Sequence, residues 1–355
     1  MCFKKLDKPP NRMNIFLTGA TGYIGHALSN QLVKNGVNVH ALVRDPAKAK
    51  LLLHPSIRLF EGDITDRNSV IRGMDGCDEV YHVAGYTRLW AANKQNFYDI
   101  NVTGTQNVLE AALHNNIKRV VYTSSCGVLG NSLKHPLCEK DSRVSSFTND
   151  YDLSKHICEC MVREYVARGL DAVIVNPSRV YGPGPAGFSN PFSKMIERCL
   201  EGKVIIIPRP GNVLANYAYI DDVVSGHISA MRLGRTGERY ILGGANLSYD
   251  EVIDILRNEI FNPRIISIGS FALLSIGYLN LLKYYLTGTE PDLTPNLVSR
   301  ITRNAALDCS KAISELNYTI TPFRKGIRAI ITNNKHTFHE HYLFHADHRR
   351  ERRLG

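Results

Sequence analysis

The amino-acid sequence predicts an α/β fold with a doubly wound parallel sheet, followed by a smaller C-terminal portion. Short apolar runs alternate with helical patterns between residues 14 and 177, which is typical of parallel sheets covered by helices on both faces. A glycine-rich turn follows the first run, and small or polar residues end the later ones. Ligands of such sheets gather where the strands end, so these residues are candidates for a binding site.

The first predicted strand, Asn14–Leu17, leads into the stretch Thr18-Gly19-Ala20-Thr21-Gly22-Tyr23-Ile24-Gly25 and then into a helical pattern. Gly19 permits a tight turn, Gly22 lets phosphates approach the backbone, and Gly25 lets the helix lie close to the strand. The helix N-terminus offers free N–H groups to an anion. The glycine spacing departs by one residue from G-x-G-x-x-G, so a turn without a ligand is the alternative. We predict a dinucleotide pyrophosphate site here, with candidate residues Gly19, Thr21, Gly22, Tyr23, Ile24 and Gly25.

The second predicted strand, Val37–Val43, delivers Arg44 at its end. In a dinucleotide-binding fold this position faces the adenosine ribose, where arginine suits a 2′-phosphate and an acidic residue suits the 2′-hydroxyl. NADP is therefore the favoured cofactor. Asp45 follows directly and could turn toward a ribose, which leaves NAD possible. Lys48 is a further phosphate candidate, and its alternative interpretation is a solvated helix face.

The third and fourth predicted strands, Ile57–Ile64 and Val80–Gly85, also end in residues that suit a cofactor. Asp63 can meet an adenine edge with its carboxylate. Small residues close the fourth strand, as expected where the backbone passes close to a ligand. We interpret His82, inside that strand, as a packed residue rather than a catalyst. The candidates from these strands are Asp63, Ile64, Val83, Ala84 and Gly85.

A hydroxyl, a phenol and an ammonium group form the candidate catalytic set. A helical pattern spans about 96–114, and the fifth predicted strand, 119–125, ends at Ser125, which can hold a carbonyl or alcohol oxygen. Tyr151 and Lys155 stand four residues apart in the next predicted helix, so both lie on one of its faces. The ordinary pKa of a tyrosine, about 10, is too high for acid–base chemistry at neutral pH. We expect the Lys155 cation, with the charge of a nicotinamide, to lower it.

Composition excludes several other classes of protein. The formal net charge is +10, but basic residues are scattered and no nucleic-acid-binding motif occurs, so we predict no nucleic-acid partner. The 8 cysteines lack the spacing of a zinc site or a disulfide framework. The histidines near the C-terminus lack H-E-x-x-H spacing, and no metal site is predicted. Because no cleavable signal opens the chain, we expect a cytoplasmic protein.

One mostly apolar run, residues 265–282, needs a separate interpretation. Six serine, glycine and asparagine residues interrupt it, and a membrane-spanning helix needs about 20 predominantly apolar residues. We expect a buried or substrate-lining helix. Contact with a membrane surface is possible but not favoured, and a true span is the remaining alternative.

Taken together, these motifs resemble the extended short-chain dehydrogenase/reductase superfamily of NAD(P)-dependent epimerases, dehydratases and reductases. The resemblance implies a Rossmann fold, catalysis by Ser125, Tyr151 and Lys155, and a nicotinamide contact through Pro177, Ser178 and Val180. It also implies that Asp63 and Ile64 flank the adenine and that 83–85 line the cofactor. The similarity runs from about residue 14 to 331 and rests on residues 18–25, 62–64, 101–105, 123–125, 151–155, 176–184 and 219–223.

Two subgroups of the superfamily look similar to this chain. Val43–Pro46 resembles the dihydroflavonol 4-reductase group, whose arginine contacts the 2′-phosphate of NADP. Residues 81–84, 88–90 and 237–244 also resemble bacterial proteins named hopanoid-associated sugar epimerases. Asn176 replaces an arginine, and Leu129 a tyrosine, of many sugar-nucleotide enzymes, although galactose epimerases also carry an Asn-Pro pair here.

The favoured function is therefore NADPH-dependent reduction of a ketone or aldehyde. The alternatives are a sugar-nucleotide epimerase or dehydratase, which has a small sugar substrate, and a nucleotide-binding protein without catalysis. A homodimer through the helices around Asn101 and Tyr151 is possible by resemblance. We expect a flexible leader (1–12), an NAD(P)-binding Rossmann domain (13–180), a mainly substrate-binding portion with returns to the Rossmann domain (181–332) and a basic, His-rich, disordered tail (333–355).

Overall fold

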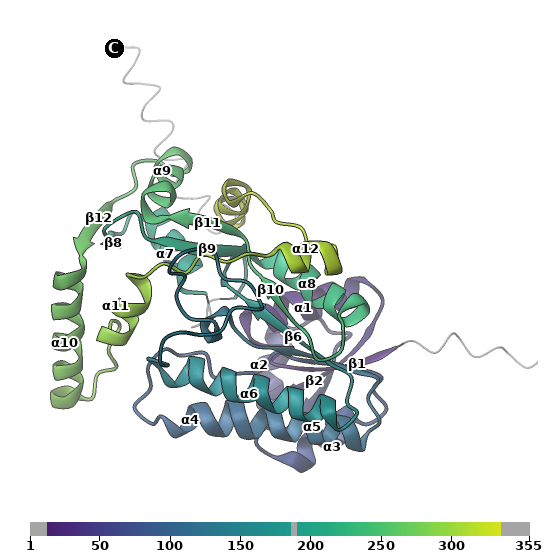
Figure 1. The fold of residues 1–355 in the computed structure, drawn as a ribbon. Coiled ribbons are helices and arrows are strands. Elements are labelled where there is room, and N and C mark those ends of the chain that lie inside the picture. Colours follow the sequence, from purple (N-terminus) through teal and green to yellow (C-terminus); the bar gives the residue numbers. More distant parts are fainter. Residues whose placement is uncertain (1–12, 186–189, 335–355) are drawn as a thin grey trace, which may run out of the picture.

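The structure, a computed structural model, describes residues 13–185 and 190–334. At its centre is a seven-stranded sheet with the order β10-β6-β5-β4-β1-β2-β3, and all of its strands are parallel (Figure 1). This confirms the doubly wound parallel sheet. The strand order reverses between β1 and β4, the kind of place where α/β proteins bind ligands. The strands are β1 (Asn14–Thr18), β2 (Asn38–Val43), β3 (Arg58–Glu61), β4 (Glu79–His82), β5 (Arg119–Thr123), β6 (Ala172–Pro177) and β10 (Arg239–Leu242).

Helices cover both faces of this sheet, because its strands are apolar on both sides. Alternate residues of a strand point to opposite faces. Leu17 and Val121 thus belong to one apolar core, and their neighbours Phe16 and Tyr122 belong to the other. The first core includes residues of α1 (Tyr23–Lys34), α2 (Pro46–Leu52), α8 (Ile220–Leu233) and α12 (Ser310–Leu316), and the second includes residues of α3 (Arg67–Met74), α5 (Gly104–His114) and α6 (Asp150–Ala167).

The segment predicted as one helix over 96–114 is divided by a π-helical turn. It consists of α4 (Gln95–Phe97), the π turn η1 (Tyr98–Thr103) and α5. A Cβ at Gly104 would lie 2.7 Å from Cδ1 of Ile64, so glycine lets this segment pack closely against the loop after β3. Such π turns are frequent at functional sites, and this one contains Asn101.

A second group of elements stands beside the carboxyl ends of the large sheet (Figure 1). A three-stranded sheet has the order β11-β9-β7, and a two-stranded sheet pairs β12 with β8. The domain boundaries given above stay a prediction. The elements are β7 (Arg179–Tyr181), β8 (Ile205–Arg209), β9 (Leu214–Tyr219), β11 (Ala245–Ser248), β12 (Ile265–Gly269), α7 (Pro191–Leu200), α9 (Tyr249–Glu259), α10 (Ser270–Thr287) and α11 (Pro295–Ile301), with a short 3-10 turn η2 (Cys126–Val128) after β5.

The prediction of a buried helix over 265–282 was wrong. Its first five residues form β12, because the isoleucines of Ile265–Gly269 pair in parallel register with β8. In α10 the only buried residues are Leu273 and Gly277, while Phe271 and Tyr285 are exposed. The apolar composition of residues 265–282 thus indicated regular secondary structure, but it did not indicate whether the side chains are buried or exposed.

Within the described residues, no helix combines the length and the apolar character needed to cross a membrane. The predictions for the leader 1–12, for the tail beyond residue 334 and for part of the Gly/Pro-rich loop, 186–187, lie outside the described residues.

Candidate functional site

A cavity of about 940 Å³ lies at the carboxyl ends of β1, β2, β4, β5 and β6. Its volume is at the upper end of the range for small-molecule sites. The sequence-predicted site residues line it, with the exception of Lys48. Those brought together are Gly19, Thr21, Gly22, Tyr23, Ile24, Gly25, Arg44, Asp63, Ile64, Val83, Ala84, Gly85, Ser125, Tyr151, Lys155, Pro177, Ser178 and Val180.

The glycine loop has the shape that a pyrophosphate requires. Gly19 has a φ of +76°, and a Cβ there would lie 2.6 Å from the backbone nitrogen of Ala84. A Cβ at Gly25 would lie 2.1 Å from the carbonyl oxygen of Gly19, so the turn can close only with glycine. Gly22 is the N-cap of α1 without a side-chain cap, and the first turn has no acidic residue. The helix terminus thus offers N–H groups to an anion, and the loop fits a dinucleotide.

At the predicted ribose end, two neighbouring residues have different environments. Arg44 is exposed at the wall of the cavity. Asp45 is the N-cap of α2, and its carboxylate accepts a hydrogen bond of 3.0 Å from the backbone N–H of Lys48. The Asp45 carboxylate therefore has a structural partner outside the cavity, whereas Arg44 lines the cavity.

The three candidate catalytic residues come from the end of β5 and the start of α6. Ser125 is the N-cap of η2, and its Oγ accepts a hydrogen bond of 3.1 Å from the N–H of Gly127. Lys155 is buried, and its Nζ donates to the carbonyl oxygen of Thr123 at 2.8 Å. Tyr151 stands one helical turn before Lys155. All three side chains reach the same cavity.

Burial dominates the acid–base properties of this set. It raises the pKa of Tyr151 to about 12, Asp152 adds to the increase, and contact with Ser125 opposes it. The groups that lower this pKa are Ser125 and Arg300, and the lowering expected from Lys155 is not found. Burial also lowers the pKa of Lys155 to about 8. At neutral pH the phenol is therefore protonated and able to donate, and the lysine remains mostly a cation.

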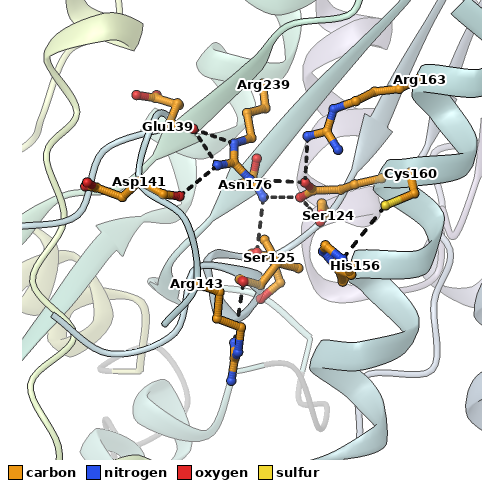
Figure 2. A network of polar contacts seen from close by, with 12 residues as sticks. Ser124, Ser125, Glu139, Asp141, Arg143, His156, Cys160, Arg163, Asn176 and Arg239 are labelled. Atoms are coloured by element: carbon orange, nitrogen blue, oxygen red, sulfur yellow. Dashed lines mark hydrogen bonds and ion pairs between the residues drawn. The ribbon is translucent and has the colours of Figure 1, made fainter. Parts of the chain in front are cut away.

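A buried carboxylate, Glu159, supports the loop that carries Ser125. Its Oε1 accepts hydrogen bonds from Ser124 Oγ at 2.7 Å and from Asn176 Nδ2 at 2.6 Å. Its Oε2 pairs with Arg163 at 3.2 Å and with Arg239 at 3.4 Å. Figure 2 shows the partners of this carboxylate gathered behind Ser125, whose carbonyl oxygen accepts a further bond from Asn176 at 3.1 Å.

Sequence reasoning missed this network and two further supports of the site. Asn176 was interpreted as a marker of substrate class, but it is fully buried and lines no part of the cavity. Asn101 accepts a hydrogen bond of 2.7 Å from the N–H of Tyr86 and so holds the loop after β4. Arg300 of α11 pairs with both oxygens of Asp152, at 2.8 and 2.6 Å. Asn101, Asp152 and Asn176 lie in motifs quoted above, whereas Glu159 and Arg300 had no local signal.

His82, interpreted above as a packed strand residue, is buried and pairs with two hydroxyls. Its Nδ1 lies 2.7 Å from Thr18 Oγ1 and its Nε2 lies 3.0 Å from Thr105 Oγ1. Burial lowers its pKa to about 3, so the ring is neutral. His82 thus joins β1, β4 and α5 beneath the cavity.

Comparison with known proteins decides the family. The family model of the NAD dependent epimerase/dehydratase family matches residues 15–243. The chain belongs to this family. Extended short-chain dehydrogenases/reductases of this kind are NAD(P)-dependent enzymes, so the sequence-based resemblance is confirmed and the chain is an enzyme of this type.

Individual relatives include reductases and epimerases. A protein provisionally named dihydroflavonol 4-reductase, from Synechocystis sp., is 29% identical over 333 residues, which are 92% of this chain and 94% of that protein. Cinnamoyl-CoA reductase 1 of Oryza sativa subsp. japonica is 30% identical and covers 70% of this chain and 76% of its own. A UDP-glucose 4-epimerase from Thermus thermophilus, solved in complex with NAD, has a TM-score of 0.72 at 19% identity over 90% of this chain and 98% of its own. The last similarity supports the fold.

Proposed function

We propose that this family member reduces a ketone or aldehyde with NADPH, which supplies the hydride when it is bound. In this proposal Ser125 donates a hydrogen bond to the carbonyl oxygen, and Tyr151 transfers its proton to that oxygen. Lys155 holds the nicotinamide ribose and provides positive charge beside the phenol. The net reaction adds a hydride to the carbonyl carbon and a proton to the oxygen, giving an alcohol and NADP⁺.

The observation that carries the proposal is a protonated phenol beside Ser125 at an apolar part of the cavity. The cavity wall beyond Tyr151 includes apolar side chains from five elements or the loops beside them, namely Leu89, Phe192, Met195, Ile206, Pro208, Val252, Leu297 and Ile301. A wall of this kind suits a carbonyl compound with an apolar body. These eight side chains offer no hydrogen-bond donor to the diphosphate and sugar hydroxyls of a sugar nucleotide.

The proposal is tested by measuring net oxidation of NADPH with a panel of aldehydes, ketones and nucleotide sugars. We expect stoichiometric oxidation with at least one aldehyde or ketone and none with UDP-glucose. The second candidate, a sugar-nucleotide epimerase, is favoured by the structural similarity to such enzymes. Conversion of UDP-glucose without net cofactor oxidation would establish it in place of the reductase.

A single substitution, Arg44→Ala, tests the preference for NADP over NAD. Arg44→Ala should raise the Kd for NADP⁺ about 10- to 100-fold, because it removes a charge-assisted hydrogen bond to the 2′-phosphate. The Kd for NAD⁺ should change less than about twofold, since NAD lacks that phosphate. Calorimetric titration gives both constants, and Lys48→Ala, outside the cavity, is the control. Equal weakening of both cofactors would contradict the assignment.

The affinity for NADP⁺ should also depend on pH through Lys155. Its pKa of about 8 means that the cation is present below that pH and is lost as the pH rises through it. If the cofactor binds the cationic form, the Kd should rise about tenfold between pH 7 and pH 9. The variant Lys155→Met should bind more weakly at pH 7 and lack this dependence. The same pH dependence in Lys155→Met would show that another group is responsible.

A further inference from the structure

Beyond Ser125 and Tyr151, a second set of polar side chains lines the same cavity. Arg179 on β7 and Tyr217 on β9 are opposite one another in a parallel pair of strands, so their side chains leave the sheet on the same side. Ser178 precedes Arg179, and Tyr249 begins α9. All four line the cavity, and none was singled out for substrate binding from the sequence.

Arg179 has no carboxylate partner among residues 13–185 and 190–334. Its Nη1 donates to Tyr249 Oη at 3.2 Å, and its guanidinium carbon lies 5.9 Å from the centre of the Tyr217 ring. Tyr249 Oη in turn donates to the carbonyl oxygen of Ile301 at 2.7 Å. A guanidinium has five N–H donors, so most of those of Arg179 remain available to a ligand.

A hydroxyl beside this guanidinium also lacks a partner. Tyr217 is 1% exposed, and its Oη makes no hydrogen bond within the described chain. A buried polar group without a partner is unfavourable and needs an explanation, and a ligand that accepts a hydrogen bond from Tyr217 would supply it. Ser178 Oγ also lacks a partner in the described chain, and the nicotinamide contact expected of Ser178 would account for it.

The neighbouring cations have partners of their own. Arg300 is paired with Asp152 through two bonds, of 2.8 and 2.6 Å. Arg143 donates to the carbonyl oxygens of Gly127 at 2.6 Å and Ser145 at 2.8 Å. Carbonyl oxygens are neutral, so Arg143 keeps its charge, but it lines the side cavity and not this one. Among these three arginines, Arg179 is thus the one that lines the main cavity with no carboxylate partner in the described chain. One cation matches a carboxylate better than a phosphate monoester, which carries about −1.5 to −2 at pH 7.

We propose that Arg179 and Tyr217 form a subsite for a carboxylate of the substrate. This inference rests on the proposed function and extends it. The substrate is then a carbonyl compound that carries a separate carboxylate, with an apolar body between the two groups against the cavity wall. Arg179 receives the carboxylate through its planar fork, and Tyr217 Oη donates to the same group.

The test uses benzoate as a carboxylate probe on the protein saturated with NADP⁺. Calorimetric titration should give a Kd for benzoate that rises about 10- to 100-fold in Arg179→Met and about fivefold in Tyr217→Phe. Arg257→Met, at an exposed arginine of α9 that lines neither cavity, should bind benzoate as the wild type does. Methyl benzoate and phenyl phosphate should bind all four proteins more weakly than benzoate binds the wild type.

The outcomes distinguish a failure of the proposed carboxylate subsite from a failure of the proposed reductase function. Equal affinity of wild type and Arg179→Met for benzoate would overturn the subsite, as would tighter binding of phenyl phosphate than of benzoate. If affinity for benzoate depends on Arg179 but no carbonyl compound is reduced, the proposed function fails and the subsite stands. Thermal unfolding of each variant shows that it is folded.

Discussion

Replacement of Tyr151 by phenylalanine is expected to lower kcat for carbonyl reduction about 10³-fold, because general-acid catalysis contributes about 10²–10⁴. The phenol is the protonated donor beside Ser125, and burial keeps its pKa high, at about 12. The phenyl ring retains the packing, so the Kd for NADP⁺ should stay within about threefold of the wild-type value. Steady-state kinetics and a separate cofactor titration measure the two effects.

A matched control lies on the same helix. Tyr165 points its hydroxyl to Glu110 at 3.3 Å and does not line the cavity, so Tyr165→Phe should leave kcat unchanged. If Tyr151→Phe retained wild-type kcat, Tyr151 would not be the proton donor. Another group would then have to donate the proton.

Replacement of Glu159 by glutamine is expected to lower the free energy of unfolding by about 3 kcal/mol, because it removes one partner of a buried ion pair. The side-chain amide keeps the size of the carboxylate but leaves Arg163 and Arg239 without its negative charge. The bonds that hold Ser124 and Asn176 behind the catalytic loop weaken as well, so kcat should fall. Unfolding in urea, followed by circular dichroism, measures the stability change.

Glu164→Gln, an exposed position on the same helix, provides the control and should change the stability by less than about 0.5 kcal/mol. Similar small changes for both variants would contradict the account of Glu159. They would mean that the two arginines find other partners or water.

Much of the fold could be predicted because its signals are local. Buried parallel strands form continuous apolar runs, and the Gly19 turn needs only neighbouring residues and the start of α1 to be recognised. The π turn at Tyr98–Thr103 has no comparable pattern, since it depends on contacts with other elements. The Ile265–Gly269 strand was missed because its apolar residues are equally typical of a helix, and only pairing with β8 decides between them.

The same distinction between local signals and contacts with distant elements applies to the residues of the site. The candidates were recognised by glycine spacing, by position at a strand end, by helical spacing (Tyr151 and Lys155) or by family resemblance (Pro177, Ser178 and Val180). The fold assembles all of them but Lys48 around one cavity. Glu159, Arg179 and Arg300 act through partners on other elements. Asp152, for example, is 148 positions before Arg300 in the chain, and no spacing rule connects them. Homodimerisation through the helices around Asn101 and Tyr151 stays a prediction.

The most direct test of the account follows the hydrogen that is transferred. NADPH carrying deuterium at both C4 positions is incubated with the protein and a carbonyl substrate from the panel, and the product is analysed by mass spectrometry and NMR. We expect one deuterium on the carbinol carbon of the alcohol for each NADPH oxidised, and about 10³-fold slower formation of this labelled alcohol by Tyr151→Phe under the same conditions. Products without deuterium, with no NADPH consumed while a nucleotide sugar is converted, would contradict the assignment of this protein as a carbonyl reductase.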